Sequence, residues 1–421
     1  MKIEHFFVSG YKNLVDCTID PNGLHAITGC NSSGKSNLLE VIPFLITMLS
    51  GSDDVRQRSI NEGFCPFGFW VPIHQNQKEV NPFRLEIECR IQSDSKQWQV
   101  KYQLEIMPPT NPIYGKNPES GRFLSEVFMA KQIGTPGISA TLVRRMEDGT
   151  TIVADEKGPR NKDKFKTRSD MSALRSLEVR EADDFPNNFP LLSNFMTSLL
   201  SSNLIRLDPE DFRQKLNVRL RPLMPPKSPG EIVLSYDPYH LIEDIQKDKK
   251  RWNQFIFWLK EIGEIEKITL FEFPMNQNTD SKSKTETYKC ITTFQHGRPQ
   301  FSAELSMGGA VVLGFLIALY SFLDTGGIIL FEEPENHLHP QAIEKMITMF
   351  REFADQRTIL FSTHSPVVIN SMKPSEITVM RHLKDGFVTT QKVSDNKEAI
   401  EALNRNFFSL GDLLQKNFES S

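Results

Sequence analysis

The chain has 421 residues, 39% of them hydrophobic, which is enough for two or three domains with a sizeable core. The formal net charge of −4 gives no overall attraction to nucleic acid, so any such binding requires a local basic patch. The 5 cysteines include no C-x-x-C pair and have no histidine at metal-ligand spacing. This pattern argues against a disulfide framework and a zinc site, and it favours a reducing cytoplasm.

Residues 1–28 alternate apolar and polar positions and contain turn signals, which predicts a small antiparallel sheet. The first residues have the pattern of a strand rather than of a basic and then apolar leader, so no signal peptide is expected. Further strand patterns at 83–92, 98–106 and 139–145 are separated by proline-rich breaks. This arrangement predicts a β-rich lobe built as a meander.

Helical patterns dominate from 191 to 263, which predicts an inserted, mainly helical subdomain over 160–265. Strand character returns at 266–273, and the polar tract 276–287 is expected to be a loop or hairpin tip. The longest apolar run, 310–323, has 14 residues, whereas roughly 20 are needed to span a membrane. It predicts a buried helix and no membrane partner.

A phosphate-binding pattern lies between a short apolar strand at 24–28 and a helix expected to begin at Asn37, whose N-terminus would face the phosphates. The pattern G-x-x-x-x-G-K-[ST] is matched at every fixed position by Gly29, Cys30, Asn31, Ser32, Ser33, Gly34, Lys35 and Ser36. In such a loop backbone N–H groups converge on phosphate oxygens, the lysine reaches the terminal phosphates, and the serine hydroxyl can bind Mg²⁺. The sequence therefore predicts that the chain binds a nucleoside triphosphate.

Two carboxylates follow an apolar run at 328–331. Such a run is typical of a strand buried on both faces, and ligands bind at the carboxyl ends of parallel strands. We expect Glu332 to hold Mg²⁺, directly or through water, and Glu333 to act as general base on the attacking water. A glutamate pair alone is more often a solvated turn, but the strand and the phosphate loop together favour the metal site.

Two further segments extend this pattern. Ser306 and Gly308 precede the apolar run, so a helix N-terminus could hold the γ-phosphate of a nucleotide bound by another subunit, although an ordinary N-cap is the alternative. His364 follows an apolar strand at 358–363 and is placed to touch a phosphate. A lone histidine at a strand end is more often structural.

Taken in order, these segments resemble the ABC-type ATPases that are not transporters, including the structural-maintenance-of-chromosomes and overcoming-lysogenization-defect-like ATPases. The resemblance covers 1–50 and 288–375, and the run 332–340 is most similar to AAA-labelled ATPases of small bacterial operons, many of them linked to anti-phage defence. It implies an α/β fold, in which a P-loop ABC-type head carries an antiparallel β lobe and the inserted helical subdomain. The two halves of the head are expected at 1–159 and 266–421.

The resemblance implies that ATP is the nucleotide and that Lys35, Glu333 and His364 act in its hydrolysis. Two subunits would pair head to tail around two ATP molecules, with Ser306 and Gly308 acting across the dimer. Larger homo-oligomers are compatible with this arrangement.

Two positions depart from the pattern of these ATPases. Glu332 replaces the more usual aspartate, and Met307 precedes the glycine pair where a glycine or aspartate is often found. The Q-loop of this class is not fixed by the sequence, and Gln57 is one candidate.

Larger lysogenization-defect-like proteins carry a TOPRIM nuclease, but the residues after His364 contain no D-x-D cluster, so we expect no nuclease here and a separate effector protein. The favoured hypothesis is an ATP-hydrolysing sensor or regulator in anti-phage defence. One alternative is a DNA-binding repair ATPase, and another is a scaffold that binds ATP without hydrolysing it. DNA contact would fall to a basic segment that is more often a solvated loop, namely Lys157, Arg160, Lys162, Lys164, Lys166 and Arg168.

Overall fold

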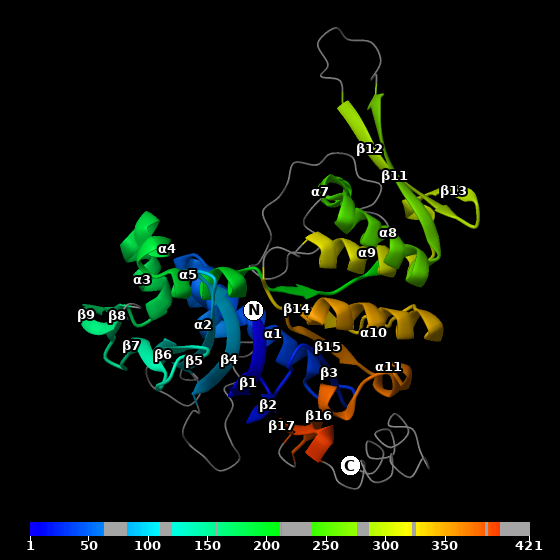
Figure 1. Cartoon of the computed structure of the whole chain (residues 1–421). Helices are drawn as coiled ribbons and strands as arrows, with labels where there is room; N and C mark the ends of the chain where they lie inside the picture. The colour runs from blue at the N-terminus through cyan, green and yellow to red at the C-terminus, as the bar shows by residue number, and fades with distance from the viewer. Residues whose placement is uncertain are drawn as a thin grey trace.

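Two large sheets and a set of helices form the body of the protein (Figure 1). The computed structural model describes residues 1–62, 82–109, 120–155, 158–210, 212, 238–275, 286–321, 326–383 and 386–395. Part of the basic segment and most of the polar tract 276–287 lie outside these residues. In the described part of the chain, no helix is long and apolar enough to cross a membrane.

The six-stranded sheet is mainly parallel and has the order β10-β14-β15-β3-β16-β17. The first five strands in this order run parallel to one another, and only β17 is antiparallel. The strands are β3 (Leu24–Thr28), β10 (Asn203–Ile205), β14 (Ile329–Glu332), β15 (Ile359–Thr363), β16 (Ile377–His382) and β17 (Val388–Lys392). The chain segments before and after the large middle region therefore build one sheet.

The eight-stranded sheet is antiparallel throughout, with the order β2-β1-β4-β5-β6-β7-β8-β9. Its strands are β1 (Lys2–Ser9), β2 (Cys17–Ile19), β4 (Phe83–Ser93), β5 (Lys96–Met107), β6 (Arg122–Gln132), β7 (Ala140–Arg145), β8 (Thr150–Asp155) and β9 (Gly158–Lys166). Buried positions alternate with more exposed ones along β4 and β5, because one face of the sheet packs on the core. The predicted meander is confirmed.

The parallel sheet is buried on both faces, and consecutive residues of β14 contribute to different cores. Leu330 belongs to the core shared with the antiparallel sheet, whereas Ile329 and Phe331 belong to a second core. The first core contains α1 (Lys35–Ser50), and the second contains α7 (Pro238–Lys247), α8 (Lys249–Gly263), α9 (Met307–Ser321) and α10 (Pro340–Ala354). The predicted buried helix corresponds to α9, which is apolar around its circumference.

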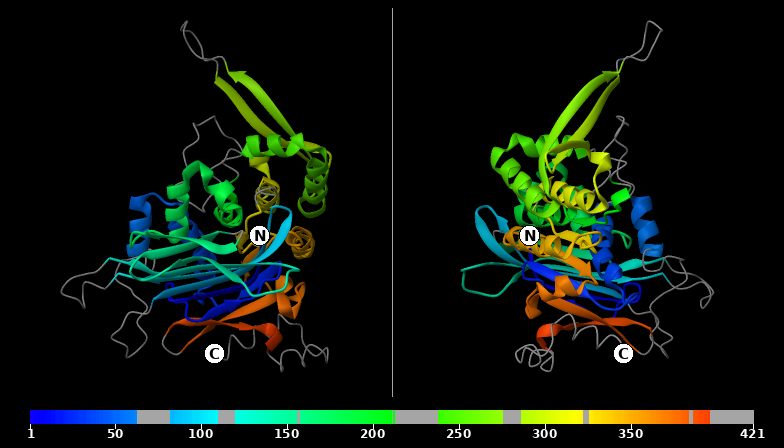
Figure 2. Two further views of the ribbon diagram at one scale, coloured as in Figure 1. Left: turned by 60° about the vertical axis from the view of Figure 1, so that its left-hand side comes forward. Right: turned by 90° about the vertical axis from the view of Figure 1, so that its right-hand side faces the viewer.

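The other α-helices of the described residues pack around these layers. They are α2 (Asp53–Glu62), α3 (Ala173–Glu181), α4 (Phe185–Asn188), α5 (Pro190–Leu200) and α11 (Pro366–Asn370). A third sheet of three strands contains β11 (Ile265–Met275), β12 (Glu286–Gln295) and β13 (Arg298–Phe301). The β11–β12 hairpin projects away from the body in all three views (Figures 1 and 2).

The range 160–265, expected to be one mainly helical insertion, is organised differently. It begins in β9, an outer strand of the antiparallel sheet, and later supplies β10 to the parallel sheet. Its helices also divide, because α3 and α5 contribute to the first core and α7 and α8 to the second. This range therefore joins both sheets instead of standing apart from them.

Candidate nucleotide site

The carboxyl ends of parallel strands bring the predicted motifs to one edge of the six-stranded sheet. The phosphate loop follows β3, the glutamate pair ends β14, and His364 follows β15, which lies between these two strands (Figure 1). In the strand register Glu332 pairs with Ser362, and Thr363 pairs with Thr28. Residues more than 300 positions apart in the chain thus become neighbours, as the parallel-sheet rule predicts.

The phosphate loop turns sharply into α1 at Gly34, whose φ is +81°. A Cβ at this position would lie 3.0 Å from the Asn13 side-chain oxygen and 3.1 Å from a Val388 methyl group, so both the conformation and the close packing favour glycine. Asn13 also accepts a 2.7 Å hydrogen bond from the Asn37 amide. The Ser33 hydroxyl is buried without a hydrogen-bond partner among the described residues, which leaves a polar atom available inside the loop.

Lys35 is folded back onto its own loop. Its ammonium group donates to the carbonyl oxygens of Gly29 at 3.1 Å and Cys30 at 2.8 Å. Burial lowers the pKa of this ammonium, and the nearby Glu333 carboxylate opposes that effect. The lysine is therefore positioned among the loop's backbone groups, while Asn31 and Ser32 are exposed at its tip.

The Ser36 hydroxyl donates a hydrogen bond to Glu332, which joins the first turn of α1 to the end of β14. A hydroxyl and a carboxylate are the oxygen donors that Mg²⁺ prefers, and this ion commonly uses one or two carboxylates together with phosphates and water. No cluster of three or more acidic, histidine or cysteine ligands occurs among the described residues. The donor set therefore fits a magnesium ion that is shared with a bound phosphate.

Glu333 adopts a left-handed backbone conformation, with φ of +45°. Its N–H donates to the Ser362 backbone and side-chain oxygens, both at 3.2 Å, and its carboxylate accepts from the Asn336 amide at 3.0 Å. The other carboxylate oxygen lies 3.5 Å from His364 Nε2. A strained residue held by several contacts is common at functional sites.

The pKa of His364 is lowered by burial first and by Lys35 second, while Glu333 opposes the shift. Because the ordinary value is near 6.5, the imidazole is neutral at pH 7. Its contact with Glu333 is then a dipolar one rather than an ion pair. The histidine can accept or donate one proton at this edge of the sheet.

Glu335 is a buried carboxylate that the sequence patterns did not single out. One of its oxygens accepts the Thr363 hydroxyl at 2.5 Å and the His364 backbone N–H at 3.1 Å. The other oxygen is buried without a hydrogen-bond partner among the described residues, and burial raises the pKa of the group. Glu335 thereby fixes the end of β15 to the turn that follows β14.

Ser306 and Gly308 lie at the start of α9, as predicted. The Ser306 hydroxyl accepts the Gly309 N–H at 3.1 Å, so it caps the helix. A Cβ on Gly308 would lie 2.8 Å from the His337 carbonyl oxygen, which shows how closely the helix start approaches the turn after β14. These contacts are local to one subunit and leave the predicted role across a dimer as a proposal.

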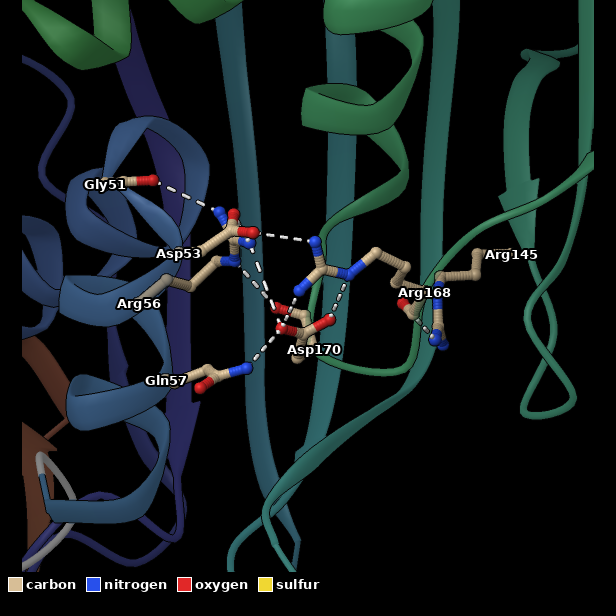
Figure 3. A network of polar contacts seen from close by, with 7 residues as sticks. All are labelled: Gly51, Asp53, Arg56, Gln57, Arg145, Arg168 and Asp170. Carbon is tan, nitrogen blue, oxygen red and sulfur yellow. Dashed lines mark hydrogen bonds and ion pairs between the residues drawn. The ribbon is translucent and has the colours of Figure 1, made fainter.

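Gln57 belongs to a polar network between α2 and the loop after β9 (Figure 3). Its amide donates to Asp170 at 3.1 Å, and Arg168 pairs with both Asp170 and Asp53 at 2.7 Å. The buried Arg56 donates to the Asp170 carbonyl oxygen at 2.7 Å. In this structure, Gln57 therefore contributes to the joint between α2 and the antiparallel sheet.

Strand β10 is hydrogen-bonded to β14, and Arg206 directly follows β10. Arg206 therefore lies beside Glu332, the last residue of β14. Its guanidinium contacts both Glu332 and Glu40. The sequence signal for Arg206 is two apolar residues, Leu204 and Ile205, followed by a polar one, a shorter form of the signal that identified Glu332 and His364. With only three residues in the strand, that signal was too short to be recognised.

Comparison with known proteins finds one family and two individual proteins that are similar to this chain in sequence. Residues 166–370, just under half of the chain, match the family described as "AAA domain, putative AbiEii toxin, Type IV TA system". The chain is 34% identical over 113 residues to the OLD nuclease of Thermus scotoductus, which covers 26% of this chain and 21% of that protein. It is 26% identical over 157 residues to protein ea59 of Escherichia phage lambda, covering 35% and 30% respectively. The chain spans less than a third of the length of these relatives.

The chain resembles the ABC-type ATPases of the AAA class. Solved structures similar to this chain include the SMC head domain from Thermotoga maritima, with 11% identity, a TM-score of 0.42 and coverage of 93% of this chain and 99% of that one. Another is the Smc head bound to the C-winged-helix domain of ScpA, with 14% identity, a TM-score of 0.46 and coverage of 95% and 100%. The ABC-type fold itself rests on the P-loop and the order of the parallel sheet.

Proposed function

We propose that this ABC-type ATPase binds ATP with Mg²⁺, hydrolyses it, and uses the nucleotide to pair two subunits and regulate a separate effector protein. The observation that carries the proposal is the hydrogen bond from Ser36 to Glu332. It connects the helix that begins at the phosphate loop to the carboxylates of another strand in the same sheet. Glu333 and His364 lie beside this pair.

Each residue has a chemical task in this proposal. Lys35 donates to phosphate oxygens in place of the loop carbonyls that it now contacts, and Ser36 and Glu332 hold the metal. Bound Mg²⁺ neutralises charge that develops on the phosphate oxygens. Glu333 accepts a proton from the attacking water, and the neutral His364 stabilises the terminal phosphate by a hydrogen bond.

We further propose that Ser306 and Gly308 act on the nucleotide of a partner subunit, giving a homodimer or a larger homo-oligomer. Support comes from the exposed Ser306 side chain at the N-terminus of α9, because the dipole at the start of a helix favours an anion. The resemblance to ABC-type ATPases implies this arrangement, in which two subunits pair head to tail around two ATP molecules. Nucleotide would then control assembly as well as chemistry.

A role in anti-phage defence, acting through a separate effector, is the biological part of the proposal. Its support is the similarity to a family named for the AbiEii toxin, to an OLD nuclease and to a phage protein. Among the described residues, Cys17, Cys30, Cys89 and Cys290 form no disulfide bond, and Cys65 lies outside those residues. The proposed location in a reducing cytoplasm rests on the cysteine pattern of the sequence.

Direct DNA binding by the basic segment has less support. Lys166 pairs with Asp148, and Arg168 pairs with Asp53 and Asp170, so these cations already have acidic partners. Phosphate contacts would have to replace those pairs. A repair ATPase therefore stays the alternative function.

The test measures equilibrium binding of a fluorescent ATP analogue and phosphate release for the wild type and Lys35→Ala, with and without double-stranded DNA. Lys96→Ala, at the exposed lysine that begins β5, is the control. We expect hydrolysis by the wild type and the control, and at least tenfold weaker nucleotide binding by Lys35→Ala. Binding without hydrolysis would favour the scaffold, DNA-dependent turnover would favour the repair ATPase, and absence of binding would refute the proposal.

A further inference from the structure

Arg206 is the basic residue at the metal-binding edge that the sequence patterns did not identify. It directly follows β10, which is hydrogen-bonded to β14 in parallel register, with Ile205 opposite Phe331. Arg206 and Glu332 are therefore equivalent in position, each coming after one of these opposed residues. The end of β10 thus delivers a cation to the carboxylate that we assign to the metal.

The guanidinium of Arg206 bridges two carboxylates. Its Nε donates to one oxygen of Glu332, whose other oxygen accepts the Ser36 hydroxyl. A terminal nitrogen of Arg206 donates to Glu40, which also pairs with Lys12. Both oxygens of Glu332 are consequently engaged by groups of the protein itself.

The contacts of Arg206 with Glu332 and Glu40 join groups of opposite charge. Burial alone would raise the pKa of Glu40, but hydrogen bonds from Lys12 and Arg206 lower it, so this carboxylate is ionised. Burial disfavours the charged form of Arg206, yet its bonds to Glu40 and Glu332 raise its pKa. An arginine held by two carboxylates in this way is a fixed positive charge.

The backbone that carries Arg206 is also fixed. The adjacent Leu207 packs against α9 so closely that a Cβ at Gly314 would lie 2.9 Å from a Leu207 methyl group. The core on that side includes Ile205 from β10. The backbone on either side of Arg206 is therefore anchored, to the parallel sheet through β10 and to α9 through Leu207, while its side chain contacts Glu332 and Glu40.

We propose that Arg206 is a positioning residue whose permanent positive charge belongs to the metal site. It holds Glu332 against Ser36, so a divalent ion must share the Glu332 carboxylate with the Arg206 guanidinium. This inference rests on the proposed function of the site. The charge of Arg206 opposes binding of a divalent ion in the absence of nucleotide. The same charge favours the anionic phosphates, so it supports nucleotide binding even without metal.

The first experiment needs no nucleotide. Binding of Mn²⁺ to the nucleotide-free protein is measured from the electron paramagnetic resonance signal of the free ion, for the wild type, Arg206→Gln and Arg206→Lys. We expect Arg206→Gln to bind Mn²⁺ at least fivefold more tightly than the wild type, and Arg206→Lys to stay closer to the wild type because it keeps the charge. Unchanged or weaker Mn²⁺ binding by Arg206→Gln would overturn the inference.

The second experiment measures the affinity for a fluorescent ATP analogue in Mg²⁺ and in EDTA. Arg206→Gln should lose about tenfold in affinity in EDTA and much less in Mg²⁺, so the ratio of the two affinities rises. A residue that only stabilised the fold would weaken both equally, which would contradict the inference. Arg84→Gln is the matched control, because Arg84 pairs with Glu105 on the antiparallel sheet, and its ratio should equal that of the wild type.

The two proposals can fail separately. If the wild type binds no nucleotide in either condition while Arg206→Gln tightens Mn²⁺ binding, the ATPase proposal fails and the role of Arg206 stands. If the wild type binds and hydrolyses ATP while neither Mn²⁺ affinity nor the affinity ratio changes, the role of Arg206 fails alone. Melting temperatures of all variants, measured without ligands, establish that the compared proteins are folded.

Discussion

The Glu333 carboxylate lies 3.5 Å from the His364 imidazole, although the two residues follow different strands of the parallel sheet, β14 and β15. Neither group is held by this contact alone. Glu333 is fixed by Ser362 and Asn336, and the His364 backbone is fixed by Glu335. The pair is therefore supported from both strands, which gives each side chain a defined position for chemistry.

Replacing Glu333 by glutamine should separate nucleotide binding from hydrolysis. The amide keeps the size of the side chain but cannot accept a proton from water, so we expect phosphate release to fall by about 10²–10⁴-fold. Nucleotide binding should persist, and an ATP-dependent dimer should accumulate. Steady-state phosphate release and light scattering with ATP measure the two effects, and a variant that retains wild-type turnover would contradict the assignment of Glu333 as base.

Glu335 provides a second test, because glutamine at this position keeps an acceptor oxygen and removes the charge, whereas alanine removes both. Glu335→Ala leaves the Thr363 hydroxyl and the His364 N–H without this partner, so we expect a loss of about 1–3 kcal/mol in the free energy of unfolding. Glu335→Gln keeps an acceptor oxygen and should lose less stability and less turnover than Glu335→Ala. Urea unfolding and phosphate release check this order; equal losses in both variants would mean that the charge itself is required.

The arrangement of the candidate nucleotide site could be predicted because each of its motifs is local in sequence. The phosphate loop, Glu332 and His364 each follow an apolar strand of the parallel sheet. The rule that ligands bind at the carboxyl ends of such strands then brings them together without further information. No knowledge of the long middle region was needed for that step.

The middle region could not be predicted in the same way. β10 has only three residues, and its partner β14 lies more than 100 residues later, so the pairing depends on tertiary structure. The basic run at β9 resembled a solvated loop, but it forms an outer strand where charged residues prevent further pairing. Arg206 was missed for the first reason, and strand β9 was missed for the second.

Gly308 tests the close contact between α9 and the turn after β14. In Gly308→Ala the new Cβ would meet the His337 carbonyl oxygen at 2.8 Å, a backbone atom that cannot rotate away. We expect a loss of about 1–3 kcal/mol in stability and a weaker ATP-dependent dimer. In Gly309→Ala the nearest atom is the Ser306 hydroxyl at 3.3 Å, so this neighbouring control should lose less stability. Thermal unfolding and light scattering compare the variants, and a Gly308→Ala protein as stable as Gly309→Ala would argue against the tight contact.

His25 predicts how stability depends on pH. Its ring is fully buried in β3, with one nitrogen 2.8 Å from the Thr378 hydroxyl and the other without a hydrogen-bond partner among the described residues. Burial lowers its pKa from the ordinary 6.5 to about 4. The unfolded chain therefore binds one more proton than the folded protein between these values, so the contribution of His25 to stability is complete above pH 6.5 and is lost as the pH falls toward 4.

Urea unfolding of the wild type and His25→Gln over this pH range isolates that contribution. Glutamine cannot take up a proton here, and its amide can still reach Thr378. The difference in unfolding free energy between the wild type and the variant should fall by about 1.4 kcal/mol for each pH unit below the ordinary histidine pKa. A difference that stays constant with pH would show that His25 titrates alike in the folded and unfolded states.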